Sequence, residues 1–103
     1  MSLSYGWEKL HNAIHSLCGQ GNQAARLINA VAYSLIHIDP KNDIPEDIQD
    51  EFKEFMDEIT AVPAQNNEGS IQATINTLDE NGLSEAIEKV IHFYDKVCRH
   101  SEP

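Results

Sequence analysis

The stretch DPKNDIPEDIQDEFKEFMDE, residues 39–58, contains nine carboxylates and two lysines among twenty residues. It therefore carries −7 of the −10 formal net charge of the 103-residue chain. Apolar residues recur in and just after it at helical spacing: Ile48, Phe52, Phe55 and Ile59. Pro45 suits the first turn of a helix, and Asp39-Pro40 suits the end of a preceding one. The stretch predicts a helix stop followed by one amphipathic helix from Ile44 to Thr60.

The rest of the chain has helical apolar spacing as well, and no segment alternates with period two. Spacing and helix-breaking residues predict further helices over Ser4–Gln20, over Asn22–Ile38 with Asn22 as its N-cap, and over Leu83–Arg99. Between the acidic helix and the last one they predict a loop over residues 62–70 and a short helix that Ser70 caps and Asn81-Gly82 ends. The expected core stripe of the last helix is Leu83, Ile87, Val90, Tyr94 and Val97. We expect one all-α domain over residues 1–103, an up-and-down bundle of four to five helices, in which residues 1–3 are a vector-derived remnant.

The second predicted helix is apolar around almost its whole circumference, which is typical of a central helix or one covered by another chain. We therefore expect it to be the central helix, and we expect the protein to form a homo-oligomer, such as a homodimer. Its polar residues form a strip at helical spacing: Arg26, Asn29, Tyr33 and His37. This strip is either a solvent-exposed seam or part of a groove or dimer interface.

Composition excludes several function classes. The seven Lys and Arg residues are scattered, so we expect neither nucleic-acid binding nor binding to an anionic membrane. No run of about twenty apolar residues exists, so no membrane span is predicted. Cys18 and Cys98 are expected to be buried free thiols, and a cytoplasmic location is expected by default.

The acidic stretch does not fit a calcium-binding EF-hand loop. Counted from Asp39, a ligand position is Lys41 and the glycine position is Ile44, while the twelfth position is Asp50 instead of glutamate. As a helix, its acids form a solvated face, and those in the first turn interact favourably with the helix dipole.

The dipole does not explain the acids near the end of this helix, and Glu54–Glu58 is a repulsive i,i+4 pair. Glu54, Asp57 and Glu58 are therefore the residues at which we expect a basic protein partner to bind.

Two metal sites are alternatives. Glu8, His11 and His15 share a face of the first helix, so His11, His15 and a third ligand are compatible with one zinc ion, and Cys18 lies on the same flank. A two-metal carboxylate centre is excluded because no second Glu-x-x-His is present. His37, His92 and His100 are expected to be exposed and unpaired.

The second metal alternative uses the pairs Glu51-x-x-Glu54 and Glu85-x-x-Glu88, with Asp95 beyond them. Their spacing resembles that of the all-α nucleotide pyrophosphatases of the MazG type, which implies Mg²⁺ held between facing helices. Glu85 and Glu88, however, lie opposite the expected core stripe of their helix.

No nucleophile motif or phosphate-binding loop is present, and the sequence assigns no catalytic residue, cofactor or metal ligand. The predicted function is a non-enzymatic protein-interaction or regulatory module. The alternative is a metal-dependent enzyme that uses either the Glu-x-x-Glu pairs or His11 and His15.

Overall fold

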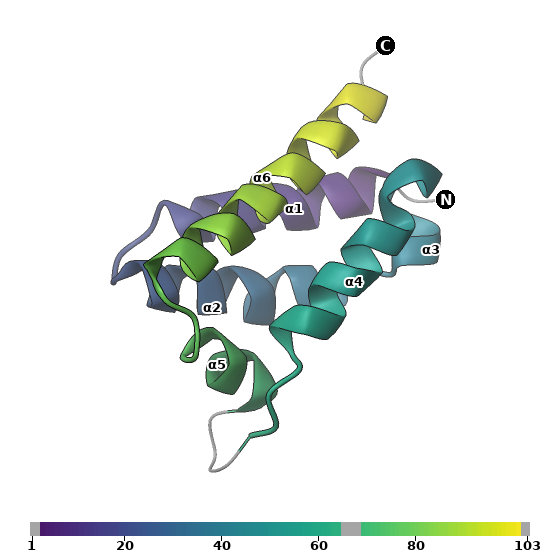
Figure 1. The fold of residues 1–103 in the computed structure, drawn as a ribbon. Helices are drawn as coiled ribbons and strands as arrows, with labels where there is room; N and C mark the ends of the chain where they lie inside the picture. Colours follow the sequence, from purple (N-terminus) through teal and green to yellow (C-terminus); the bar gives the residue numbers. More distant parts are fainter. Residues whose placement is uncertain (1–2, 65–68, 102–103) are drawn as a thin grey trace.

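The computed structural model describes residues 3–64 and 69–101, and within them it is helical and contains no strand. The elements are α1 (Leu3–Leu17), α2 (Gln23–Tyr33), the 3₁₀ turn η1 (Leu35–His37), α3 (Pro40–Asp43), the 3₁₀ turn η2 (Glu46–Ile48), α4 (Gln49–Ile59), α5 (Gly69–Ile75) and α6 (Glu80–Ser101) (Figure 1). The predicted all-α bundle is confirmed, with the single turn α3 as an unexpected addition.

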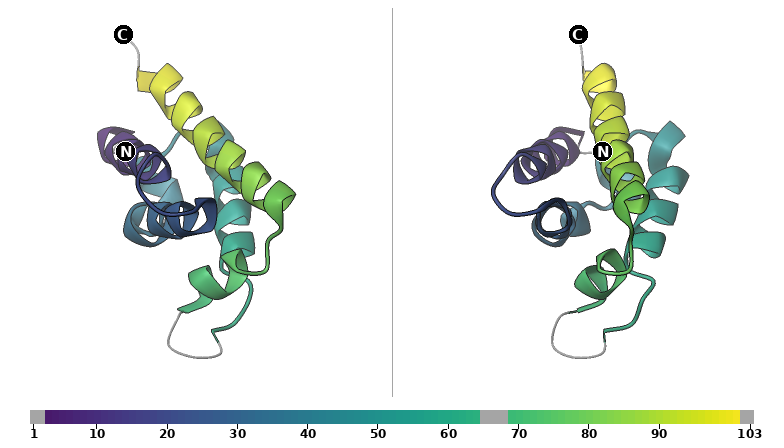
Figure 2. Two further views of the ribbon diagram at one scale, coloured as in Figure 1. Left: turned by 90° about the vertical axis from the view of Figure 1, so that its left-hand side faces the viewer. Right: turned by 60° about the vertical axis from the view of Figure 1, so that its left-hand side comes forward.

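α1 packs against both α2 and α6, and these are the most extensive helix contacts of the fold. α1 and α2 run antiparallel, and α6 lies obliquely across them in the views of Figures 1 and 2. α4 occupies the same side as α6, and α5 lies against α2 at the lower end of Figure 1. The Cα radius of gyration is 13.2 Å, close to the ~13 Å expected of a compact chain of this length.

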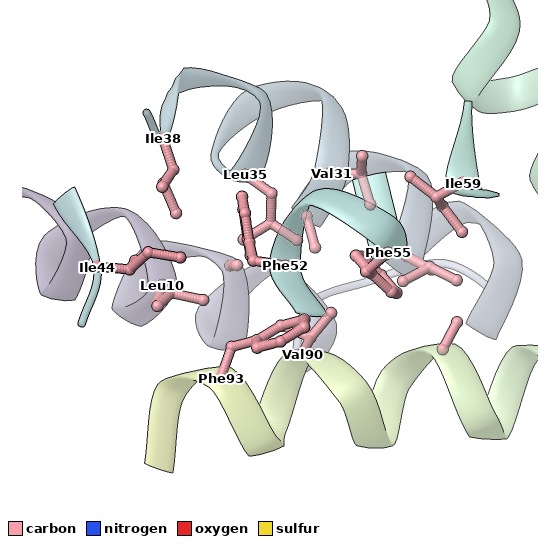
Figure 3. Close-up of a cluster of buried hydrophobic side chains, with 14 of the residues drawn as sticks. Leu10, Val31, Leu35, Ile38, Ile44, Phe52, Phe55, Ile59, Val90 and Phe93 are labelled. Carbon is pink, nitrogen blue, oxygen red and sulfur yellow. The ribbon is translucent and has the colours of Figure 1, made fainter. Parts of the chain in front are cut away.

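The core lies between α1 and α2 on one side and α4 and α6 on the other, and Figure 3 shows its centre. The largest fully buried side chains come from every long helix and from the η segments: Phe52, Phe93, Leu10, Leu27, Leu35, Ile44, Ile48, Ile75, Val31, Val90 and Val97. Phe93 packs edge to face on Phe52 and Phe55, with ring centroids 5.2 and 5.6 Å apart. Such contacts add about 0.5–1.5 kcal/mol each to the burial energy.

The predicted stripe of the last helix is rotated from the observed one. Ala86, Val90, Phe93 and Val97 are buried on α6, whereas Leu83, Ile87 and Tyr94 are only partly buried. The rotation is explained by Phe93, which fills the space between α6 and α4.

The second predicted helix begins as expected and ends early. The side chain of Asn22 accepts a hydrogen bond from the Ala25 N–H at 2.8 Å, which confirms it as the N-cap. The α-helix ends at Tyr33, and a buried Ser34 leads into η1. This change of helix type allows Leu35 and Ile38 to turn into the core.

The segment after Asp39 is not a plain helix stop. Asp39 caps α3, with its Oδ1 accepting from the Lys41 N–H at 3.2 Å and Pro40 at the first helical position. Asp43 is buried, and its Oδ2 accepts from the Asp39 N–H at 2.8 Å. The Asp43 N–H donates in turn to the Asp39 carbonyl at 2.8 Å. Because these bonds satisfy the backbone N–H groups of Asp39, Lys41 and Asp43, a single turn is stable here.

Two boundaries in the second half of the chain were predicted wrongly. Asn81 and Gly82 do not end a helix but lie in the first turn of α6, where the Asp79 Oδ1 accepts from the Gly82 N–H at 2.8 Å. Ser70 lies inside α5 instead of capping it from outside. Of the predicted loop 62–70, residues 65–68 lie outside the described residues.

Gly6 allows α1 to approach α3 closely. It is buried, and a Cβ at this position would collide with the backbone carbonyl of Asp43. A glycine within a helix usually destabilises it relative to alanine, so its presence here is explained by this close approach.

Gly6→Ala is expected to lower the free energy of unfolding by about 1–3 kcal/mol, because the overlap outweighs the better helix propensity of alanine. Urea denaturation measures this change. The control is Ser4→Ala on an exposed position of α1, which should change stability by less than about 0.5 kcal/mol. An equal or greater stability of Gly6→Ala would contradict the close approach.

Candidate functional site

A groove of about 210 Å³ lies between α4, the segment around α5 and the first turns of α6. Its apolar lining consists of Phe55, Ile59, Leu78 and Ala86. Its charged lining consists of Glu51, Glu54, Glu58, Glu85 and Lys89, and Thr74 and Gly82 complete it. The groove thus has an apolar base with carboxylates on both sides, contributed by α4 and α6.

The groove continues along α6 into a more open hollow of about 380 Å³. The two share Glu51, Glu85 and Lys89, and the hollow adds Glu88 and His92. We call the combined surface the acidic groove. Its carboxylates come from Glu51, Glu54, Glu58, Glu85 and Glu88.

Glu51 is the best-paired of these acids. Its carboxylate lies 3.5 Å from the Lys89 Nζ and 3.4 Å from the His92 Nε2. These side chains are substantially exposed, so each pair contributes at most about 1 kcal/mol. Lys89 is the one lysine or arginine among the described lining residues, and the acidic groove therefore keeps an excess of negative charge.

The structure separates the three acids predicted to meet a basic partner. All three are exposed, and Glu54 and Glu58 line the groove, whereas Asp57 does not. The acids expected on the solvated face nearer the start of the helix, Glu46, Asp47 and Asp50, are exposed as predicted.

The two Glu-x-x-Glu pairs come together in space, because Glu51, Glu54, Glu85 and Glu88 all line the acidic groove. Asp95 does not line it, and its carboxylate lies 2.9 Å from the Arg99 Nε. Within residues 3–64 and 69–101, no group of three or more Asp, Glu, His or Cys side chains is close enough to hold a metal ion.

The polar strip of the second predicted helix extends past the end of α2. Arg26 donates from Nη1 to the Leu17 carbonyl at 3.2 Å, so it binds the carboxyl end of α1. Asn29 and Tyr33 are exposed on α2, whereas His37 lies on η1, beyond the end of that helix. Tyr33 is 72% exposed in the described part of the chain.

The histidines of α1 lie closer together than helical spacing requires. The Nε2 atoms of His11 and His15 are 3.1 Å apart. Trp7 stacks on His11 with ring centroids 4.6 Å apart and an interplanar angle of 14°. The hydroxyl of Tyr94 on α6 lies 3.1 Å from the His11 Nδ1. The sequence indicated the His11–His15 pair, but it gave no signal for the contact with Tyr94.

The surroundings of Tyr94 favour its protonated form. Burial raises the pKa of Tyr94, and its hydrogen bond to Cys98 raises that pKa further, while a hydrogen bond from Trp7 acts in the opposite direction.

Several expectations for single residues were wrong. Cys18 is exposed instead of buried and Cys98 is partly buried, although both are free thiols. His92 pairs with Glu51, and His100 lies 3.3 Å from the Asp47 carboxylate. Both pairs join α6 to the η2–α4 segment, which sequence spacing cannot indicate.

Comparison of the chain with protein-family models, with curated proteins and with solved structures finds no match. Among the described residues, no helix has both the length and the apolar character needed to cross a bilayer. A function is therefore inferred from the acidic groove and the residues around it.

The position of Glu58 predicts that its charge destabilises the free protein. It lies in the last turn of α4, at the negative end of the helix dipole, and one turn after Glu54. Glu58→Gln should raise the free energy of unfolding by about 0.3–1 kcal/mol. Glu46→Gln, which removes a carboxylate before the start of α4, should lower it. Urea denaturation at low salt tests both, and changes of the same sign would contradict the dipole argument.

Proposed function

We propose that this chain is a non-enzymatic protein-interaction module that binds a basic, amphipathic segment of a partner protein in the acidic groove. The observation that carries the proposal is the combination of an apolar base with carboxylates from two facing helices. An amphipathic helix binds such a groove through its apolar face, while its flanking cations meet the acids at the edges.

The charge distribution supports a basic partner. Among the described residues, four acids of the groove have no ion pair, and the chain carries a net charge of −10: these acids are Glu54, Glu58, Glu85 and Glu88. This excess attracts cations over long distances and accelerates their association, an effect that salt weakens. The repulsion between Glu54 and Glu58 is also relieved when a cation lies between them.

Binding of a labelled synthetic peptide, built from leucine and lysine so that its helix has one apolar and one basic face, tests the proposal by fluorescence anisotropy. The triple variant Glu54→Gln, Glu58→Gln, Glu85→Gln should weaken this binding by about 5- to 20-fold, since it removes three charge contacts. Lys89→Gln should strengthen it, because a competing cation leaves the groove.

The matched control removes three acids that do not line the groove, as Glu46→Gln, Asp50→Asn, Asp57→Asn. This control variant has the same net charge as the groove variant. It should weaken peptide binding by less than about twofold, through the lower overall charge alone, and salt should screen that effect. If the two triple variants weakened peptide binding equally, the peptide would be responding to the overall charge of the protein, and specific binding in the acidic groove would be contradicted.

A Mg²⁺-dependent activity is the second candidate, because both Glu-x-x-Glu pairs line one groove. The pairing of Glu51 with Lys89 and the wide spread of the carboxylates favour docking over metal chemistry. Thermal shifts with Mg²⁺ and with nucleotides distinguish the two. A Mg²⁺-dependent stabilisation that the triple variant abolishes, together with nucleotide hydrolysis, would replace the docking proposal.

We also propose that the protein forms a homo-oligomer. We further propose a cytoplasmic location, which suits a protein-binding module. The exposed Tyr33 and Ile36, one turn apart on α2 and η1, are the apolar residues on which a second copy would pack. Light scattering after size exclusion should show a mass above that of one chain, and Tyr33→Ser with Ile36→Ser should reduce it. A monomeric wild-type protein at high concentration would exclude the oligomer.

A further inference from the structure

The Nε2 atoms of His11 and His15 face each other across one turn of α1, 3.1 Å apart. The rings meet edge to face at an angle of 68°. Two imidazoles bound to one zinc ion, each at about 2.0–2.1 Å in tetrahedral geometry, have nitrogen atoms about 3.3 Å apart. The pair already has nearly the separation that a shared metal ion requires.

His11 is held in this orientation from two sides. Trp7, one turn earlier on α1, stacks against its ring. Tyr94 on α6 holds its Nδ1 at 3.1 Å. When the His11 Nδ1–H donates to the Tyr94 hydroxyl, the Nε2 of His11 carries the lone pair and faces His15. An imidazole whose far nitrogen donates to a fixed oxygen is the arrangement typical of metal-binding histidines.

His15 completes the pair with a small change. In this arrangement without a metal, the Nε2–H of His15 donates to the Nε2 of His11. When a cation enters, this proton moves to the Nδ1 of His15 by exchange with water, which the exposure of His15 permits. Both nitrogens then present lone pairs, and the neutral rings need release no net proton.

We propose that His11 and His15 form a two-histidine chelate for a divalent late transition-metal ion of the Zn²⁺, Ni²⁺ and Cu²⁺ class. Imidazole nitrogen is a preferred donor for these ions. No third Asp, Glu, His or Cys joins the pair within the described residues, so water occupies the remaining coordination positions. This site is separate from the acidic groove and does not rest on the docking proposal.

Isothermal titration calorimetry with ZnCl₂ and with NiCl₂, on the full chain after removal of metals by a chelator, tests the proposal. One ion per chain should bind. His11→Ala and His15→Ala should each weaken binding by at least about tenfold, and Tyr94→Phe should weaken it less, through the lost orientation of His11. Lowering the pH should weaken binding, because protonated imidazoles do not coordinate.

The controls are His37→Ala and His100→Ala, histidines outside the pair, which should leave the affinity unchanged within about twofold. His11→Gln keeps a polar side chain near Tyr94 but has no imidazole, so it should weaken binding as His11→Ala does. Circular dichroism checks that each variant is folded. The electron paramagnetic resonance spectrum of the Cu²⁺ complex should show nitrogen ligands, which a merely structural role of the pair would not produce. Absence of binding to the wild type, or binding that survives in the double variant His11→Ala, His15→Ala, would overturn the chelate.

Discussion

The edge-to-face packing of Phe93 against Phe52 and Phe55 is the constraint on which the rest of the structure depends. These three rings hold α4 and α6 together in the core, and their bulk keeps the two backbones apart. Phe55 also lines the acidic groove, and beyond it, toward the first turns of α6, the opposing surfaces carry smaller or shorter apolar groups, such as Ala86 and Leu78. The acidic groove lies there because nothing of comparable size fills the gap.

Electrostatics then gives the groove its character. The exposed pairs that join α4 and η2 to α6 add little to stability, but they align the two segments. The remaining carboxylates stay hydrated at the edges, where mutual repulsion costs a few tenths of a kcal/mol per pair. A bundle tolerates such a cost when its core is well packed, and the unrelieved charge leaves a surface complementary to a basic segment.

α6 connects this groove to the histidine pair. Glu85 and Lys89 in its first half line the groove, whereas Tyr94 in its second half holds His11 of α1. The two surfaces therefore use different stretches of one helix, and neither shares a residue with the other. Substitutions in one surface therefore leave the residues of the other unchanged, so the two can be tested separately.

The sequence by itself determined the fold class, most helix positions, the Asn22 cap and the solvated acids of α4, because these follow from local spacing and capping. It also brought His11 and His15 to one face, since i,i+4 residues are neighbours on any helix. Only the tertiary structure decided the close approach at Gly6, the inward turn of Phe93 and the burial of Asp43. Only it separated Asp57 from Glu54 and Glu58 and brought both Glu-x-x-Glu pairs to one groove. These features depend on how helices distant in sequence rotate and cross, and side-chain volume in the shared core sets that geometry.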